Sequence, residues 1–317
     1  MSQKAAIIIV NWNGKKFLKN CLEAVFAQEY KNFEVYLVDN GSADESLKFV
    51  KDNFPRVKTI GLNKNTGFAK GNNEGIKVAL LDKEVKYIVC LNNDTIVDKN
   101  WLESLVAAVD YRKKIDMVSS LCIFPDGRVQ SIGIRFEKDL CGAKEGGLAI
   151  GFKESPKKYQ EKKEIFCPNG ASCLFTRRLL ERVGLFDEDF FAYGEDLDLG
   201  MRARKAGYKC IFTPESKLVH LHSMTSGGPA SPLKAYLVKR NVYFVAIKNF
   251  TLTDLLLFPL RDLGWNIKNI FNQGGEKSSN ILKKRVGLFG IVWILLKAYT
   301  SVIYSAPKMI IKRLCIK

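Results

Sequence analysis

Over the first hundred residues, near-continuous apolar runs alternate with segments whose apolar residues recur every three or four positions. The apolar runs have strand length, whereas the second spacing is that of an amphipathic helix. The predicted strands lie within 5–14, 33–44, 57–62 and 85–97, and the predicted helices lie within 15–28, 45–54 and 67–81. Apolar strands that alternate with helices predict an α/β fold, with a Rossmann-like, mostly parallel sheet covered by helices on both faces.

Polar residues end three of these strands, at positions 11–13, 39–42 and 92–94. In a parallel sheet the carboxyl ends of the strands meet at one edge, and open α/β sheets bind their ligands in the crevice beyond that edge. We therefore expect these three groups to line one binding site.

The second half of the chain has a weaker pattern. Residues 115–165 show no clear periodicity, and the lysine-rich stretch 153–164 predicts an exposed loop. Residues 166–184 predict a polar turn, a short strand and a helix. A further helix is expected to begin after Gly194 and to be closed by Gly207.

The composition fits a globular chain. It has 317 residues, of which 47% are hydrophobic and 26% are charged, so it can bury the core of one large domain or two smaller ones. The eight cysteines form no C-x-x-C pair, and several lie in apolar runs, which predicts reduced and mostly buried thiols in a cytosolic protein. The N-terminal apolar run is too short for a signal peptide, so we expect no secretion signal.

The net charge of +17 is concentrated near the C-terminus. Positions 261–317 hold eleven Lys and Arg against two Asp and Glu, around an apolar segment that Lys297 interrupts. The uninterrupted run of about a dozen residues is shorter than the roughly 20 that span a membrane, whereas basic residues beside an amphipathic helix favour an anionic membrane surface. The alternative is a basic helical pair that packs on the main domain or at a dimer interface. Because this segment is apolar and no nucleic-acid-binding motif is present, nucleic acid is not expected as a partner.

Asp39 ends an apolar strand and is followed by Gly41 and Ser42. A carboxylate in this place can accept hydrogen bonds from the base or ribose of a nucleoside, and the alternative is that Ser42 or Asp44 caps the next helix. The first strand is not followed by G-x-G-x-x-G, and the chain has no P-loop sequence. The main sequence support for a dinucleotide site or a P-loop site is therefore missing.

Asp94 ends the next long strand, directly after two asparagines. Divalent cations need anionic oxygen ligands and keep positions open for substrate phosphates, so one carboxylate and a diphosphate can hold such an ion. The alternative is an ordinary turn residue. The two histidines of the chain, His220 and His222, face the same side of a predicted strand. One of them could contact a metal or a phosphate, or both could be surface histidines.

Three acids, Glu195, Asp196 and Asp198, gather at the start of a predicted helix, directly after aromatic residues. Helix amides stabilise carboxylates in the first turn, and apolar surroundings raise the pKa of a carboxyl group toward the range of a general base. Asp198 and Arg202 are four positions apart, which predicts an ordinary helix ion pair. The alternative is that the acids only favour the helix start.

These motifs together resemble the family 2 glycosyltransferases with the GT-A fold, and among them the rhamnosyltransferase-like branch that builds surface polysaccharides. The resemblance covers about residues 5–250 and is carried, in the family's order, by "IIIVNWNG", "VDNGSAD", "NTGFAKGNN", "LNNDT", "NGASCLFTRR", "FDEDFFAYGEDLDLGMRARKAGY" and "VHLHSMTSG". It implies an enzyme that transfers a sugar, with inversion, from a UDP- or dTDP-linked donor to an acceptor hydroxyl.

The resemblance also implies roles for single residues. Asp196 matches the general base, and Asp39 matches an acid that contacts the nucleobase or ribose. Asp94 matches the last Asp of the D-x-D motif, which holds Mg²⁺ or Mn²⁺, and Asn92 stands where the family often has the first Asp. His220 matches a histidine that joins the metal in some members, with His222 as its rival. The donor side is further expected to hold Asn11, Gly67, Lys70, Asn92 and Asn93, and the acceptor side Asn169, Gly170, Ala171 and Glu195.

We expect a GT-A glycosyltransferase domain over residues 1–250 and a helical, membrane-associating extension over 251–317. Many surface glycans grow on lipid-diphosphate carriers, so the expected acceptor is a glycan or lipid-linked glycan, and the expected location is cytoplasmic, on the inner face of the cell membrane. One competing interpretation is a sugar-phosphate nucleotidylyltransferase, which needs a glycine-rich loop where this chain has "NWNGKK". Another is a catalytically silent nucleotide-sugar-binding protein. The base, the sugar, the acceptor and the oligomeric state stay open.

Overall fold

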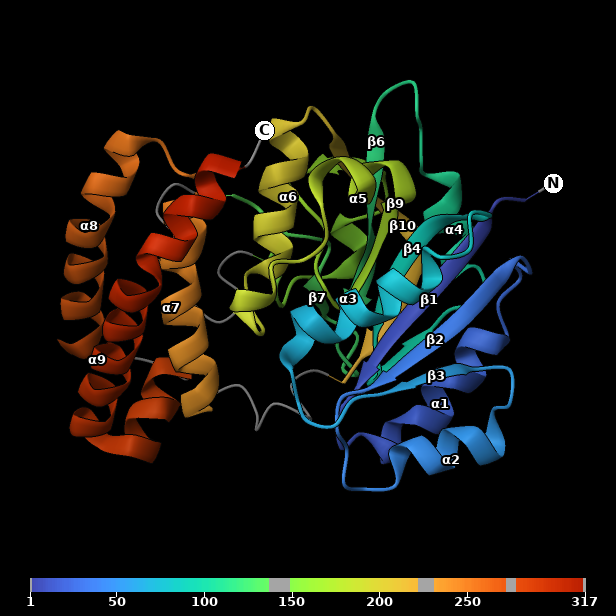
Figure 1. The fold of residues 1–317 in the computed structure, drawn as a ribbon, viewed down its shortest axis with the longest axis horizontal. Helices are drawn as coiled ribbons and strands as arrows, with labels where there is room; N and C mark the ends of the chain where they lie inside the picture. Colours follow the sequence, from blue (N-terminus) through green and yellow to red (C-terminus); the bar gives the residue numbers. More distant parts are fainter. Residues whose placement is uncertain (1, 137–148, 222–230, 272–277, 316–317) are drawn as a thin grey trace.

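The computed structural model of the protein describes residues 2–136, 149–221, 231–271 and 278–315. Figure 1 shows a twisted sheet with helices on both faces and, beside it, a layer of C-terminal helices. The strands and helices predicted for the first hundred residues are all present. The α/β fold class predicted from the sequence is therefore confirmed.

The described part of the chain forms a ten-stranded sheet. Its strands are β1 (Lys4–Asn11), β2 (Phe33–Asp39), β3 (Lys58–Gly61), β4 (Val85–Asn92), β5 (Thr95–Val97), β6 (Ile115–Ile123), β7 (Val129–Ser131), β8 (Lys163–Ile165), β9 (Ser172–Thr176) and β10 (Lys209–His220). Eight of them follow the order β3-β2-β1-β4-β9-β6-β10-β5, while β7 pairs with β6 and β8 pairs with β10.

The sheet is mixed rather than mostly parallel. Strands β3, β2, β1 and β4 are parallel, as are β6 and β10. In contrast, β9 is antiparallel to both of its neighbours, and β5, β7 and β8 are antiparallel to their partners. The chain passes from β6 to β7 in five residues, too few for the crossover that a parallel pair requires. The expected parallel arrangement thus holds for the N-terminal half of the sheet.

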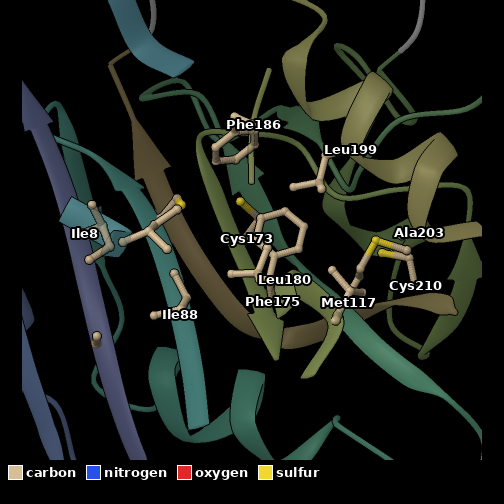
Figure 2. Close-up of a cluster of buried hydrophobic side chains, with 14 of the residues drawn as sticks. Ile8, Ile88, Met117, Cys173, Phe175, Leu180, Phe186, Leu199, Ala203 and Cys210 are labelled. Carbon is tan, nitrogen blue, oxygen red and sulfur yellow. The ribbon is translucent and has the colours of Figure 1, made fainter. Parts of the chain in front are cut away.

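Helices cover both faces of the sheet. One face carries α1 (Lys15–Phe26), α2 (Ser46–Asn53) and α4 (Trp101–Ala107), and the other carries α3 (Gly67–Ala79), α5 (Arg177–Val183) and α6 (Glu195–Lys205). Alternate side chains of β1 enter the two layers, since Ile7 and Ile9 belong to the first apolar cluster and Ile8 to the second. Figure 2 shows the second cluster, in which Phe175 of β9 and Leu199 of α6 lie.

Residues 115–165 differ from the sequence prediction. β6 is buried almost throughout and lies inside the sheet, and β7 and β8 add short antiparallel pairs. The sequence did not predict β6, because Ser119 and Ser120 interrupt its apolar run. The hydroxyl of Ser120 is buried and lies 2.8 Å from that of Ser172 on β9, so the polar position is satisfied inside the core. The stretch 153–164 is largely exposed, as expected.

α6 begins and ends at glycines, as the sequence predicts. Gly194 precedes its first residue with a φ of 88°, and Gly207 follows its end with a φ of 82°. The N–H of Gly207 donates to the carbonyl of Arg204 (2.9 Å), and the N–H of Tyr208 donates to that of Ala203 (3.0 Å). This Schellman arrangement satisfies the last carbonyl groups of the helix.

The C-terminal helices are α7 (Pro232–Asn249), α8 (Leu252–Phe271) and α9 (Ser278–Cys315), and α9 lies along α7 (Figure 1). A third apolar cluster joins Leu197 and Met201 of α6 to Phe244 of α7, Phe258 of α8 and Met309 of α9. These helices therefore pack against the outer side of α6, next to the α/β part.

Within the part of the chain that the structure describes, one helical segment, Ile281–Cys315, is long and apolar enough to cross a membrane. We expected Lys297 to leave an apolar run too short to span a membrane. That expectation is wrong, because a single lysine does not make the helix polar overall. The apolar side chains of α8 and α9 that face away from the bundle include Leu256, Leu260, Phe289, Trp293, Ile303 and Tyr304, each more than half exposed.

Candidate active site

Asn11, Asp39 and Asn93 form a buried, hydrogen-bonded group at the carboxyl ends of β1, β2 and β4. Asn11 lies between the other two: its Nδ2 donates to Asp39 Oδ1 (3.1 Å), and its Oδ1 accepts from Asn93 Nδ2 (2.7 Å). Asp44 accepts a hydrogen bond from the N–H of Ser46 at the start of α2 (3.1 Å), whereas Asp39 Oδ2 accepts one from the N–H of Ser42 in the loop (3.1 Å). Strand order reverses at β1 and β4, which is where open α/β sheets bind ligands.

Asn40 orders the loop before α3. Its Oδ1 accepts a hydrogen bond from the N–H of Thr66 (2.8 Å), and its Nδ2 donates to the carbonyl of Gly67 (3.0 Å). Gly67 has a φ of 88°, and a Cβ at this position would lie 2.4 Å from the carbonyl oxygen of Phe191. Only glycine therefore permits this approach of the α3 N-terminus to the turn before α6.

Lys70 lies in the first turn of α3, where the helix dipole favours anions. Its Nζ is 3.9 Å from Glu188 Oε2, and both side chains are well exposed. Exposed pairs of this kind contribute little to stability, so the ammonium group can turn toward a phosphate at small cost.

His220, at the end of β10, contacts the end of β4. Its Nε2 lies 3.0 Å from Asp94 Oδ1 and 3.2 Å from Asn92 Nδ2, and its Nδ1 lies 2.7 Å from Oε1 of Gln130 on β7. Asp94 and His220 are both buried. In the tautomer that donates from Nδ1 to Gln130, the lone pair of Nε2 faces the Asp94 carboxylate.

This pair offers one oxygen and one nitrogen ligand to a cation. Among the described residues, no group of three or more His, Cys, Asp and Glu side chains is arranged so that it could hold a metal ion. The donor set of Asp94 and His220 suits a divalent ion that takes its other ligands from phosphates and water. His222, the rival ligand from the sequence, lies outside the described residues.

Asp196 is partly exposed in the first turn of α6. Its Oδ2 accepts a hydrogen bond from the backbone N–H of Gly170 (3.1 Å), and its Oδ1 accepts one from the N–H of Leu197 (2.8 Å). Burial raises the pKa of the Asp196 carboxyl above its usual range, although these hydrogen bonds lower it. A carboxylate with a raised pKa and a fixed orientation can act as a general base.

Residues 169–171 contact both sides of the site. The carbonyl of Ala171 accepts a hydrogen bond from the N–H of Asn92 (3.0 Å), while the N–H of Gly170 reaches Asp196. Asn169 shapes the turn, because its Oδ1 accepts from the N–H of Ala171 (2.9 Å). One short segment therefore links the strand end that carries Asn92 and Asp94 to the carboxylate of Asp196.

Glu195 is buried, and within the described residues its Oε2 has no hydrogen-bond partner. Burial and the nearby charge of Asp196 raise the pKa of Glu195 well above its usual range. Both effects favour the protonated form of Glu195.

Asp198 forms the expected pair with Arg202 (Nε–Oδ2 3.0 Å), but the pair is buried rather than on the surface. Lys248 of α7 donates to the same oxygen (2.8 Å), and Asn249 donates to Oδ1 (3.0 Å). Burial alone would raise the pKa of Asp198, but the charges of Arg202 and Lys248 outweigh it and hold the pKa below its usual range. Asp198 thus attaches α6 to α7.

Four residues that organise the site were not predicted: Asn40, Gln130, Asn241 and Lys248. Asn40 directly follows Asp39 at a strand end, so the same signal could have identified it. Gln130 falls in the region without clear periodicity, and Asn241 and Lys248 contact residues about 50 positions away along the chain. The sequence carries no local signal for these three.

The model of the family described as Glycosyl transferase family 2 matches residues 6–184, which is more than half of the chain. The model described as Glycosyltransferase like family 2 matches residues 153–241. Together the two matches extend over the strands and helices that carry the candidate site.

The chain is 27% identical over 246 residues to the O-antigen biosynthesis protein RfbC of Myxococcus xanthus, and the match spans 76% of this chain but 19% of that protein. It is 24% identical over 254 residues to the N-acetylglucosaminyl-diphospho-decaprenol L-rhamnosyltransferase of Mycobacterium tuberculosis, over 74% of this chain and 82% of the relative. The solved structure of GalNAc-T7 with UDP, GalNAc and Mn²⁺ superposes with a TM-score of 0.64 at 17% identity, over 96% of this chain and 58% of that one. These similarities confirm the expected GT-A fold.

Proposed function

The chain belongs to glycosyl transferase family 2 and is a glycosyltransferase, and from this premise we propose that it transfers a sugar from a UDP- or dTDP-linked donor to an acceptor hydroxyl with inversion at the anomeric carbon. The observation that carries the proposal is the environment of Asp196, a partly exposed carboxylate with a raised pKa that the Gly170 N–H orients.

Inversion in one displacement requires two kinds of help. The acceptor oxygen attacks the anomeric carbon from the face opposite the leaving diphosphate, so a base must remove the acceptor's proton as the bond forms. Asp196 is assigned this role. The acceptor side consists of Asn169, Gly170, Ala171 and Glu195, and the protonated form of Glu195 can donate a hydrogen bond to an acceptor hydroxyl.

The donor is proposed to bind along the strand ends. Asn11, Asp39 and Asn93 would contact the nucleoside, and Gly67 and Lys70 at the α3 N-terminus would contact the diphosphate. Asp94 and His220, with Asn92 beside them, would hold Mg²⁺ or Mn²⁺. Such an ion, when bound, offsets negative charge on the leaving diphosphate. The Mn²⁺ in the GalNAc-T7 structure supports the choice of a divalent ion.

We further propose that residues 1–250 form the transferase domain and that 251–317 rest on the inner face of the cell membrane, where a lipid-linked glycan acceptor is available. The decaprenol-linked substrate in the name of the mycobacterial relative supports this acceptor class. A peripheral position is favoured because Lys308 and Lys312 of α9 pair with Asp189 and Asp187 of the α/β part. These pairs, together with the packing of α9 along α7, hold α9 on the protein.

Asp196→Asn tests the base. We expect turnover to fall about 10²–10⁴-fold, the usual contribution of general base catalysis, while affinity for UDP stays nearly unchanged. Turnover is measured over a panel of UDP-, dTDP- and GDP-linked sugars with a synthetic prenyl-diphosphate-linked sugar as acceptor, and affinity by calorimetry. The base must be ionised, and the pKa of Asp196 is raised above the usual Asp value of about 4. As the pH is lowered, wild-type turnover should therefore begin to fall before the pH reaches that usual value.

Asp126→Asn, on the exposed pair with Arg128, is the matched control and should behave as wild type. If Asp196→Asn kept more than a tenth of the turnover, the base would lie elsewhere. An equal loss of UDP affinity would instead assign Asp196 a structural role.

A further inference from the structure

The turn between the short 3-10 helix Glu188–Phe190 and α6 has a strained backbone. Phe191, Tyr193 and Gly194 have φ values of 64°, 72° and 88°. For residues other than glycine this left-handed region is unfavourable, and it persists where the surroundings impose it. Because Asp196 follows two residues later, the conformation of this turn determines where α6 begins and where the carboxylate points.

Asn241 of α7 lies against this turn and is 1% exposed. Its Nδ2 donates to three carbonyl oxygens, those of Phe190 (2.9 Å), Ala192 (2.8 Å) and Tyr193 (2.6 Å). A side-chain amide has two hydrogens, so one of them is shared between two carbonyls. The Oδ1 of Asn241 accepts a hydrogen bond from Nε of Arg240 (2.9 Å), which fixes the direction of the amide.

Arg240 extends the same set of contacts. Its Nη2 donates to the carbonyls of Asp189 (3.0 Å) and Phe190 (2.8 Å), and its guanidinium lies 4.9 Å from the centre of the Phe244 ring. Asn241 is the member of the pair that bonds a strained residue directly, because its acceptors include the carbonyl of Tyr193.

The opposite side of the turn contacts the donor side of the site. The carbonyl of Phe191 accepts a hydrogen bond from the N–H of Ala69 (3.1 Å) and closely approaches Gly67 in the first turn of α3. The turn therefore lies between α7 and the helix N-terminus that is assigned to the diphosphate. A shift of the turn would move Asp196 and this N-terminus relative to each other.

We propose that Asn241 is a positioning residue of the transfer reaction: by holding the carbonyls of residues 190, 192 and 193, it fixes the turn that aims Asp196 at the acceptor. The inference rests on the proposed function, since it takes Asp196 as the base. A misplacement of a catalytic group by about 1 Å can lower a rate on the order of 10²-fold, so loss of these bonds should act on turnover.

Asn241→Ala is expected to lower kcat roughly 30- to 100-fold, with less than a threefold change in the KM of the donor. The assay uses the nucleotide sugar with the highest turnover in the panel and the prenyl-diphosphate-linked acceptor. Rates are expressed per UDP-binding site from calorimetry, so that unfolded protein does not count. In addition, the acid limb of the kcat–pH profile should move to lower pH, because a loosened turn admits water to Asp196 and removes the burial that raises its pKa.

Gln28→Ala is the matched control. Gln28 is also a buried amide with three hydrogen bonds, to Ala24, Asp98 and Leu102, but it joins α1 to the start of α4. It should lower the melting temperature comparably and leave kcat per binding site within twofold of wild type. If Asn241→Ala does not fold, Asn241→Ser retains one donor and should show about a tenfold loss of kcat.

The two hypotheses fail differently. If Asp196→Asn remains active, the proposed base is wrong. If Asp196→Asn is inactive but kcat per binding site in Asn241→Ala, or in its serine substitute, matches Gln28→Ala, the base stands and Asn241 serves stability alone.

Discussion

Asp94 and His220 face each other with 3.0 Å between Oδ1 and Nε2, close enough for one cation to contact both. Asp94→Asn should remove the gain in UDP affinity that Mn²⁺ provides, because the amide keeps the shape of the side chain but loses the charge that a hard cation needs. Calorimetric titration with UDP, with and without Mn²⁺, measures this gain.

Gln130→Ala provides a graded comparison. It removes the partner that orients the His220 ring but leaves both proposed ligands, so Mn²⁺-dependent affinity should fall on the order of 10-fold and by less than in Asp94→Asn. A variant with asparagine at position 94 that kept the full Mn²⁺-dependent gain would show that the cation binds elsewhere.

Some residues of the site could be predicted from the local sequence pattern and others could not. Asp39 and Asp94 stand where apolar strands stop, so their common edge could be predicted from the hydrophobic pattern. Asn241 leaves no such signal, because its role comes from carbonyl groups about 50 positions away. Local pattern predicts which side chains lie at a strand end, whereas the residues that hold a turn in place depend on tertiary contacts.

At the scale of elements, charge attaches α9 to the segment before α6. Lys312 of α9 forms ion pairs with Asp187 and with Asp189, where Nζ lies 2.8 Å from Oδ2. Lys248 of α7 donates to Asp187 Oδ2 at 2.7 Å. Burial alone would raise the pKa of Asp187, but Lys248 and Lys312 outweigh it and lower the pKa to about 2. The carboxylate therefore stabilises the fold only while it is ionised.

The pH dependence of stability follows from that shift. The folded-state pKa lies below the unfolded value of about 3.9, so the contribution is complete above the unfolded value and is lost as the pH falls toward 2. Between pH 7 and pH 3, the free energy of unfolding of wild type should fall by roughly 1 kcal/mol more than that of Asp187→Asn. Urea denaturation at the two pH values measures the difference.

Asp52→Asn, on the exposed surface of α2, serves as the control for this comparison. It should show the same loss between pH 7 and pH 3 as wild type. If Asp187→Asn did so too, the charge cluster would not attach α9 to the segment before α6.

The elements that the sequence failed to predict share a physical reason. β6 holds two buried serines, and the hydroxyl of Ser120 bonds that of Ser172 across the sheet, so this central strand lacks a continuous apolar run in the sequence. Packing of the C-terminal helices on the main domain was one of the alternatives, but the contacts of α9 with α7 and Asp187 were not predicted, since ion pairs between distant segments leave no periodicity. Hydrophobic periodicity identifies elements whose polar residues face water, and it fails where polar groups are satisfied inside.

At the scale of the whole molecule, the strand ends and the exposed apolar helices belong to neighbouring layers (Figure 1). Phe289 and Trp293 are 84% and 52% exposed on α9, and Lys283, Lys284 and Arg285 precede them. Apolar side chains next to basic ones suit a membrane that contains anionic lipids. Truncation is a poor test of this surface, because removing α9 would also remove Lys312 from the segment before the proposed base.

Substitutions on the surface of α9 separate membrane binding from catalysis. Replacing Lys283, Lys284 and Arg285 with Gln should weaken binding to phosphatidylglycerol-containing vesicles about 100-fold, since each basic residue contributes about 1 kcal/mol at an anionic surface. Phe289→Ser with Trp293→Ser should weaken it as well, through loss of apolar burial. Vesicle flotation measures binding, and turnover on a short-chain, water-soluble acceptor should stay unchanged in both variants.

A triple Gln variant at Lys48, Lys83 and Lys86, which are exposed on the α/β part, changes the net charge equally and should bind vesicles like wild type. Equal weakening in this control would mean that overall charge, rather than the α9 surface, draws the protein to the membrane. Extraction of native membranes with alkaline carbonate distinguishes a peripheral α9 from an α9 that spans the bilayer. A peripheral α9 leaves with the soluble fraction, because alkaline pH breaks its ionic contacts with the membrane, whereas a helix of this length that spanned the bilayer would stay in the pellet.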